Sequence, residues 1–425
     1  MWVRGALFAL VLGGCYSPSF DSCLLVCAAN ETCPDGYQCS SGRCAVRGST
    51  CSPTIDGGDD GMPDGMITFN CGNGTPEPGE ICFQDPIIVD TQTSDIAAAQ
   101  LIDIDVDDKT DLVFLTTSGY ASRIRTGPTT FGPANVVGPA ATAKVMLGID
   151  LGGNTLQELV HNDTTRGVEV FQWDGDSWEL GASAASQVGF EAKGIAHGRT
   201  TSVAMEQSIA VVFPTVLRVF QLPTNALTPL TRQNSLFLLT NPKDVAIADT
   251  KGDNASEIAV ALPTGIAMFT NVSANLVAQG VPDLMAGVDA IERCDIDGGA
   301  GTEFAYTIQR VGGMSTVGGL RWNGTAYELT PTRMISNMTE PIACADFDRD
   351  GLEDAVIFGG DGNGQAYVQI LRGLSDATFA APIRFPVALP GAADIHIGRF
   401  NTDEVPDIVV TSAATGIIAV LESNP

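Results

Sequence analysis

The chain has 425 residues, of which 50 are Asp or Glu and 22 are Lys or Arg, so its formal net charge at pH 7 is −28. A chain this acidic repels nucleic acid and anionic membrane surfaces, which argues against both as binding partners. Charged residues are only 17% of the chain and apolar residues 44%, so the composition excludes a disordered acidic tail and indicates a folded protein. The 47 Gly and 23 Pro fall mostly between short runs of Val, Ile and Leu, which favours an all-β fold.

Residues 1–14 have the features of a secretion signal. Arg4 supplies a positive charge, and the apolar stretch 6–12 is too short to span a bilayer as a helix. The stretch ends in Leu12-Gly13-Gly14-Cys15, which resembles the bacterial lipobox. The resemblance implies cleavage before Cys15 and lipidation of this cysteine, and therefore an exported protein that is anchored to the outer membrane or cell surface by lipid alone. The alternative is an ordinary secretion signal, with Cys15 left to form a disulfide.

Residues 15–52 are rich in cysteine and have no periodic apolar pattern, so we expect disulfides rather than a hydrophobic core to hold them. Without Cys15, the 11 cysteines of the chain become ten, an even number. Zinc is the competing interpretation, but the segment has no C-x2-C pair and no nearby His. The sequence leaves open how the six cysteines pair, namely Cys23, Cys27, Cys33, Cys39, Cys44 and Cys51.

Residues 53–70 are dominated by Gly and Asp, which predicts an extended, self-repelling linker. The next segment, 71–83, begins with CGNGTPEPGEIC and resembles the C-G-N-G-x-x-E-x-G-E-x-C motif that is common in surface proteins of myxobacteria. The resemblance implies a disulfide between Cys71 and Cys82 and a cell-surface setting. That family usually continues with Asp-Asp-Gly and further cysteines, which this chain lacks, so we expect a single loop that acts as a rigid collar before the main domain.

From residue 84 to the end, the pattern D-x-D-x-D-G-x-x-D recurs about every 48 residues. It has all its carboxylates at 103–111 and 346–354, and it is partial in the loops that start at 150, 249, 295 and 399. Between the loops at 150 and 249, the segments 194–198 and 208–212 have the same frame of two strands around a loop, and neither segment carries a carboxylate, so we count them as a third repeat whose ion site is lost. Seven repeats follow from this register.

The loops indicate calcium, because a hard cation collects oxygen ligands in this way and close carboxylates repel one another unless they are neutralised. Magnesium fits less well, since it prefers a rigid octahedron with retained waters. Catalytic metals need an open coordination position and a nearby base, so we expect structural ions. The strong predicted ligands are Asp103, Asp105, Asp107, Asp111, Asp346, Asp348, Asp350 and Asp354. The weaker ones are Asp150, Asn154, Glu158, Asp249, Asp253, Glu257, Asp295, Asp297 and Glu303.

The seventh loop keeps Asn401, Asp403 and Asp407, but Arg399 replaces its first Asp. We therefore expect the Arg399 guanidinium to take the place of the ion there. The fourth loop has Lys251 at position 3, between its acidic residues.

Short segments rich in β-branched residues flank each loop, such as 244–248 before the fourth and 355–358 after the sixth. Asp-Gly and Asn-Gly turns follow further along, so each repeat holds about four strands, which is typical of a β-propeller blade. An EF-hand would need a helix and a Glu at position 12, and neither is present. The chain resembles the FG-GAP/VCBS repeat family, whose calcium loops lie between the first two strands of each blade, as in integrin α-subunits. The resemblance implies a seven-bladed β-propeller over residues 84–425.

The closure of the ring and the state of two cysteines both involve residues far apart in the chain. The last repeat offers only three strands, so residues 86–90 are predicted to supply the fourth and to leave no open edge. Cys294 and Cys344 lie just before the fifth and sixth loops, where a disulfide between neighbouring blades and two separate buried thiols both remain open.

No motif of an enzyme is present. His161, His197 and His396 lie outside any metal or nucleophile motif, and there is no G-x-S-x-G elbow or phosphate loop. We therefore expect a non-catalytic, calcium-stabilised interaction, adhesion or structural module of the cell envelope, whose partner is an unknown envelope or extracellular protein or a glycan. A polysaccharide lyase or another envelope enzyme is an alternative, but a lyase needs a clustered base and a cationic neutraliser.

A carbohydrate-binding lectin is the other alternative. Sugar stacking requires aromatic side chains at matching places in several repeats. Trp173, Trp178, Trp322 and Tyr327 occupy only two hairpins, where we expect them to cover blade edges.

Overall fold

The computed structural model describes two compact units, Met1–Gly58 and Asp59–Pro425, which are treated separately below. The described residues are 37–40, 43–46, 71–75, 79–90, 96–105, 107, 109–116, 119–127, 129–136, 145–149, 158–173, 177–184, 189–200, 207–222, 230–237, 241–272, 275–284, 286–310, 314–336, 338–360, 366–387, 389, 394–401, 403–412 and 415–425. Within these ranges, no helix is long and apolar enough to cross a membrane.

The described part of the first unit is an antiparallel hairpin, formed by β1 (Tyr37–Ser40) and β2 (Arg43–Val46). The predicted signal peptide, the lipidation of Cys15 and the acidic linker lie outside the described residues. The same holds for four of the six cysteines of this segment, which are Cys23, Cys27, Cys33 and Cys51.

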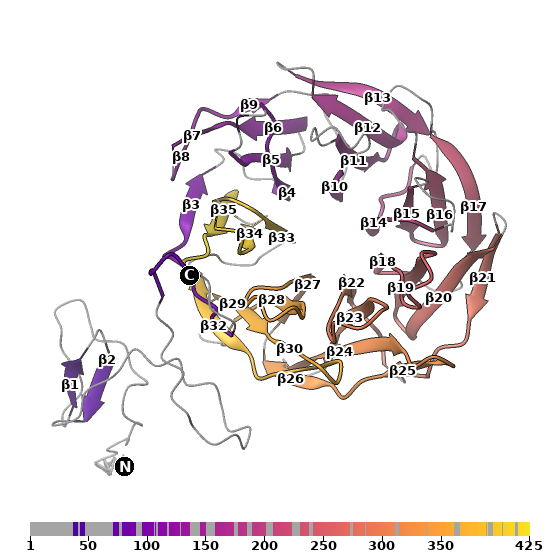
Figure 1. The fold of residues 1–425 in the computed structure, drawn as a ribbon. Helices are drawn as coiled ribbons and strands as arrows, with labels where there is room; N and C mark the ends of the chain where they lie inside the picture. The colour runs from indigo at the N-terminus through magenta and orange to yellow at the C-terminus, as the bar shows by residue number, and fades with distance from the viewer. Residues whose placement is uncertain are drawn as a thin grey trace, which may run out of the picture. The chain divides into compact units, whose positions relative to one another are not determined.

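The described part of the second unit contains seven antiparallel sheets that stand around a common centre, as the fold class predicted (Figure 1). Each sheet is one blade, and in blades 1 to 6 the strands are ordered outward from the centre as they follow in the chain. Blade 1 consists of β4 (Ile96–Ile102), β5 (Asp111–Thr116), β6 (Gly119–Arg123) and β9 (Asn135–Val136). Blade 2 consists of β10 (Met146–Ile149), β11 (Glu158–Asp163), β12 (Gly167–Trp173) and β13 (Trp178–Ala184). Blade 3 consists of β14 (Gly194–Gly198), β15 (Ser208–Phe213), β16 (Val216–Gln221) and β17 (Thr231–Phe237).

The remaining blades follow the same order. Blade 4 consists of β18 (Asp244–Ala248), β19 (Glu257–Leu262), β20 (Gly265–Val272) and β21 (Asn275–Gln279). Blade 5 consists of β22 (Ala290–Cys294), β23 (Glu303–Arg310), β24 (Met314–Trp322) and β25 (Tyr327–Leu329), and β26 (Arg333–Ser336) also pairs with β24. Blade 6 consists of β27 (Met338–Ala345), β28 (Asp354–Gly360), β29 (Ala366–Leu371) and β32 (Ile383–Val387). Two small hairpins are formed by β7 (Arg125–Gly127) with β8 (Thr130–Phe131) and by β30 (Gly373–Leu374) with β31 (Thr378–Phe379).

Blade 7 joins the two ends of the ring. Its strands β33 (Asp394–Gly398), β34 (Asp407–Ser412) and β35 (Ile417–Leu421) pair in order, and β3 (Ile87–Asp90) adds the outer strand. The register places Ile87 opposite Val420 and Asp90 opposite Ile417. This is the pairing that the sequence predicts for residues 86–90.

The core lies between the blades. The second strands β5, β11, β15 and β34 are buried at all six residues, because both faces of each sheet pack against neighbouring blades. This explains why β5, β15 and β34 contain continuous apolar runs in the sequence rather than alternating ones, whereas β11 also buries His161, Asn162 and Asp163.

The segment around the Cys71–Cys82 disulfide belongs to the propeller. Ile81 is 1% exposed and lies in one hydrophobic cluster with Phe347 and Leu421 of blades 6 and 7. Gly72 and Gly74, both with positive φ, donate backbone hydrogen bonds to the carbonyl oxygen of Pro425 at 3.1 and 2.8 Å. The packing of these residues makes them part of the same compact unit as the propeller, and their role as a rigid collar stays a prediction.

Candidate metal loops and the junction of blades 5 and 6

Each acidic loop lies between the innermost strand and the second strand of its blade. Position 9 of the loop is the first residue of the second strand, and its side chain is buried in every described repeat that carries an acid there. These residues are Asp111, Glu158, Glu257, Glu303, Asp354 and Asp407. The buried carboxylate accepts a hydrogen bond from the backbone N–H of position 2, at 2.9 Å in blade 1, 3.1 Å in blade 4 and 3.0 Å in blades 5 and 6.

In three of the described loops the acidic side chains converge. Ligand oxygens of positions 1, 3 and 9 lie within 4.8 Å of one another in the loops of blades 1, 5 and 6. The groups are Asp103, Asp105 and Asp111; Asp295, Asp297 and Glu303; and Asp346, Asp348 and Asp354. Six of the eight strong predicted ligands are therefore brought together, and one of the weaker loops joins them.

Position 5 does not join these groups. Asp107 pairs with the ammonium of Lys109, and Asp350 accepts the backbone N–H of Leu352 at 2.8 Å. These two carboxylates thus each help to close the turn of their loop, and their role as metal ligands stays a prediction. A side chain at this position can accept the N–H two residues ahead, as Asp residues commonly do in turns.

The three groups fit a hard divalent cation. All their donors are carboxylate oxygens, which are the ligands that calcium prefers. Asp348 is 1% exposed, and its Oδ2 has no hydrogen-bond partner among the described residues. Burial, reinforced by neighbouring carboxylates, raises the pKa of Asp348 to about 6 and that of Glu303 to about 7. A cation at such a site would reverse this shift, because it favours the ionised carboxylates.

The loop of blade 4 has a positive charge of its own. The ammonium of Lys251 lies 2.7 Å from Glu257 Oε1 and over the rings of Trp322 and Tyr327. Asp249 instead accepts the backbone N–H groups of the loop. The prediction of a metal site formed by Asp249, Asp253 and Glu257 is therefore not supported, because the lysine side chain neutralises the buried glutamate.

The loop of blade 7 is satisfied by neutral donors. Ser423 Oγ lies 2.9 Å from carboxylate oxygens of both Asp403 and Asp407, and Asn401 Nδ2 donates to Asp403 at 2.8 Å. Arg399 is exposed, and its backbone carbonyl accepts the hydroxyl of Thr110 in blade 1. The expectation that the Arg399 guanidinium replaces the ion is therefore wrong. In blade 2, Asp150 and Asn154 lie outside the described residues, and Glu158 begins β11.

The loops also connect neighbouring blades, which sequence reasoning missed. The backbone N–H of position 8 donates to the carbonyl of position 1 in the preceding blade. These bonds run from Ser256 to Arg199 at 2.7 Å, from Thr302 to Asp249 at 2.9 Å and from Glu353 to Asp295 at 2.7 Å. No side-chain pattern in the sequence marks a bond between two backbone groups of different repeats.

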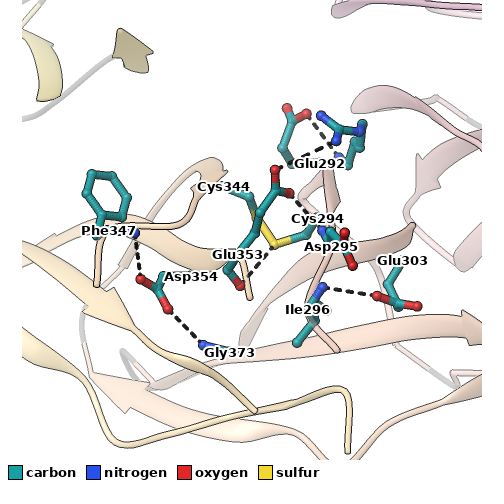
Figure 2. Close-up of a disulfide and its surroundings, with 11 residues drawn as sticks. Glu292, Cys294, Asp295, Ile296, Glu303, Cys344, Phe347, Glu353, Asp354 and Gly373 are labelled. Atoms are coloured by element: carbon teal, nitrogen blue, oxygen red, sulfur yellow. Dashed lines mark hydrogen bonds and ion pairs between the residues drawn. A yellow bond between two sulfur atoms is a disulfide. The ribbon is translucent and has the colours of Figure 1, made fainter. Parts of the chain in front are cut away.

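The junction of blades 5 and 6 carries additional contacts (Figure 2). Cys294 at the end of β22 and Cys344 in β27 form a disulfide with a Cα–Cα distance of 5.5 Å, so the bridge is present rather than two separate thiols. Glu353 Oε2 accepts the backbone N–H of Asp295 at 2.7 Å, and Glu353 Oε1 lies 3.7 Å from the Arg293 guanidinium. Glu353 of the sixth loop thus contacts both Asp295, the first residue of the blade 5 loop, and Arg293 in the strand before it.

The three histidines have partners within the blades. His161 is buried in a chain of hydrogen bonds: it contacts the Tyr120 hydroxyl through Nδ1 and Glu169 through Nε2 at 2.9 Å, and Arg166 Nε donates to Glu169 at 2.8 Å. His197 contacts Gln207. His396 lies near Gln100 and Asp394.

The paired aromatic residues face each other across two hairpins. The Trp173 and Trp178 rings are 5.3 Å apart, and those of Trp322 and Tyr327 are 5.0 Å apart. Trp178 and Tyr327 are buried, at 3% and 4% exposure. They pack between blades, which leaves little ring surface for a sugar.

Comparison with known proteins identifies the fold alone. No family model matches the chain, and no curated protein matches it in sequence. Among solved structures, it is similar to a chain in the crystal structure of BBS1N in complex with ARL6DN, soaked with mercury. The TM-score is 0.56 and the sequence identity 10%, over 81% of this chain and 97% of that chain. That similarity supports the β-propeller fold seen in the second unit.

Proposed function

We propose that this protein is a calcium-stabilised β-propeller that serves as a non-catalytic protein interaction or adhesion module of the cell envelope, held there by a lipid on Cys15. The observation that carries the calcium part is the convergence of three carboxylates in each loop of blades 1, 5 and 6. The interaction part is supported by the propeller fold and by the similar BBS1N structure, which contains a complex with another protein, ARL6DN. The envelope part is supported by the lipobox-like Leu12-Gly13-Gly14-Cys15.

In this proposal the ion joins the loop to the second strand of its blade. Positions 1 and 3 belong to the loop and position 9 to the second strand, so a bound cation ties the loop to the blade. Extracellular calcium modules commonly have dissociation constants on the order of 10⁻⁴–10⁻³ M. About 10 mM calcium would then stabilise the fold by about 1.4–2.7 kcal/mol per site.

The test is the midpoint of thermal unfolding of the full chain in about 10 mM calcium and in excess EGTA. We expect a higher midpoint in calcium and a smaller rise with magnesium. The double variant Asp346→Asn/Asp348→Asn should lose part of the rise while keeping the backbone contacts of Asp354. Equal midpoints with calcium and EGTA would refute the structural role of the ion.

Two further measurements test the envelope and partner parts. Cys15→Ser should move the protein from the membrane fraction to the soluble fraction, and continued membrane association would count against the lipid anchor. A pull-down from envelope extracts, run beside a glycan array, separates a protein partner from a sugar. A specific glycan signal without a protein partner would favour the lectin alternative.

A further inference from the structure

Glu353 lies between two acidic groups that belong to different blades. It precedes Asp354, which is buried in the sixth loop and held by the backbone N–H groups of Phe347 and Gly373, each at 3.0 Å. Glu353 also reaches the fifth loop, where it contacts Asp295 (Figure 2). One short stretch of chain thus contacts both candidate ion sites.

The contact to Asp295 has two parts. The backbone N–H of Glu353 donates to the carbonyl oxygen of Asp295 at 2.7 Å, and the side-chain Oε2 of Glu353 accepts the N–H of Asp295 at 2.7 Å. Both backbone groups of the first residue of the fifth loop are therefore fixed by one residue of the sixth. Among the described residues, the corresponding contact from blade 5 to blade 4 is the backbone bond from Thr302, and the loop it reaches has Lys251 at position 3 in place of an acidic residue.

Other contacts make this junction stiff. The Cys294–Cys344 disulfide joins the residue before Asp295 to a residue of β27 close to Asp346, and Cys294 Sγ lies 3.9 Å from the carbonyl oxygen of Glu353. A Cβ atom on Gly298 would lie 3.0 Å from Leu352 Cδ2, so the two loops are in close contact. A shift of the sixth loop would therefore displace the backbone of the fifth.

We propose that the loops of blades 5 and 6 bind divalent cations as a coupled pair, with Glu353 as the positioning residue. The proposal rests on the function proposed above, in which these loops hold calcium. An ion in the sixth loop orders residues 346–354, and Glu353 transmits this order to Asp295. The fifth loop then loses less conformational freedom when it binds its own ion, which raises its affinity. Because coupling is reciprocal, an ion in the fifth loop raises the affinity of the sixth equally.

Calcium titration calorimetry on the full chain tests the coupling. A background with Asp103→Asn and Asp105→Asn removes the blade 1 site, so that the blade 5 and 6 sites remain. Disabling the sixth loop with Asp346→Asn/Asp348→Asn should weaken calcium binding by the fifth loop about fivefold or more, the lower end of typical coupling between sites. In a Glu353→Ala background, the same disabling should change the affinity of the fifth loop by less than about twofold.

Two variants serve as controls. Glu353→Gln keeps a side-chain oxygen that can accept the Asp295 N–H, so it should keep most of the coupling. Glu404→Ala removes an exposed carboxylate that pairs with Arg349 of the sixth loop at 3.2 Å, and it should leave the coupling unchanged. Unfolding midpoints in EGTA establish that each variant is folded.

The outcomes separate the two proposals. If the chain with intact loops binds no calcium, the proposed function fails. If calcium binds but the affinity of the fifth loop is the same with and without a working sixth loop, the coupling is refuted and the proposed function stands. Coupling that persists in Glu353→Ala would overturn the role of the Glu353 side chain as the positioning group.

Discussion

The substitution Ile81→Ala tests whether the Cys71–Cys82 segment is part of the propeller. Ile81 is 1% exposed and packs with Phe347 and Leu421, whereas Ile88 on β3 is 49% exposed. Truncation of a fully buried Ile to Ala costs about 2–5 kcal/mol, and we expect about 3 kcal/mol here. For a unit of this size, that loss corresponds to a decrease of about 4 °C in the unfolding midpoint.

The assay is thermal unfolding of the full chain, followed by circular dichroism at constant calcium. Ile88→Ala is the matched control, because it makes the same chemical change at a half-exposed site and should lower the midpoint by about 1 °C or less. If Ile81→Ala lowers the midpoint no more than Ile88→Ala, the segment adds no stability to the propeller and our description of its packing is incorrect.

Three further predictions concern loop 4, the buried network of blade 2 and the outer closure strand. Lys251→Asp removes the ammonium inside the loop of blade 4, so the unfolding midpoint of this variant should depend more strongly on calcium than that of the parent chain. Thermal melts in calcium and in EGTA measure this dependence, and an unchanged dependence would contradict the role assigned to Lys251. Burial opposes the charge of Glu169, but hydrogen bonds from His161 and Arg166 outweigh it and lower its pKa. The stabilisation that the Glu169 carboxylate provides is therefore fully present above its pKa in the unfolded chain, about 4.5, and is lost as the pH falls through its lower pKa in the folded protein. In urea unfolding, Glu169→Gln should lower the free energy of unfolding by about 1–3 kcal/mol at pH 7, and below pH 4.5 the variant should lose less of this free energy than the parent chain does. An equal deficit at pH 3 and pH 7 would argue against this linkage. Deleting residues 84–92 should destabilise the propeller far more than deleting the cysteine-rich region 15–52, and similar effects in thermal melts would contradict closure by β3.

Several features of the fold can be predicted from the sequence because they depend on residues close together in the chain. Strand, turn and loop repeat within each unit of about 48 residues, so the number of blades follows from the register. The missing strand of the last repeat is not local, but it could be assigned to residues 86–90, since pairing the two ends of the ring leaves no open edge. Positions 1, 3 and 9 of the complete loops were also predictable, because the repeated pattern of acidic residues is one in which a tight loop collects oxygen ligands for a hard cation.

Other features arise from contacts between residues far apart in the chain. Ser423 occupies the loop of blade 7, and Tyr327 and Trp322 lie beside Lys251 in the loop of blade 4. Neither arrangement has a signature within the nine residues of the loop. Whether a loop needs an ion depends on which donors the rest of the fold brings to it, and a pattern within one repeat does not contain that information.

The sequence by itself therefore determined the class of fold, the register of the repeats and the acidic character of the loops, because these depend on residues close together in the chain. Only the tertiary structure decided which loops gather three carboxylates, which are neutralised from within, and how Glu353 connects blades 5 and 6. The physical reason is that burial and hydrogen-bond partners are properties of the packed ring, in which a residue of one blade meets side chains and backbone groups of the next.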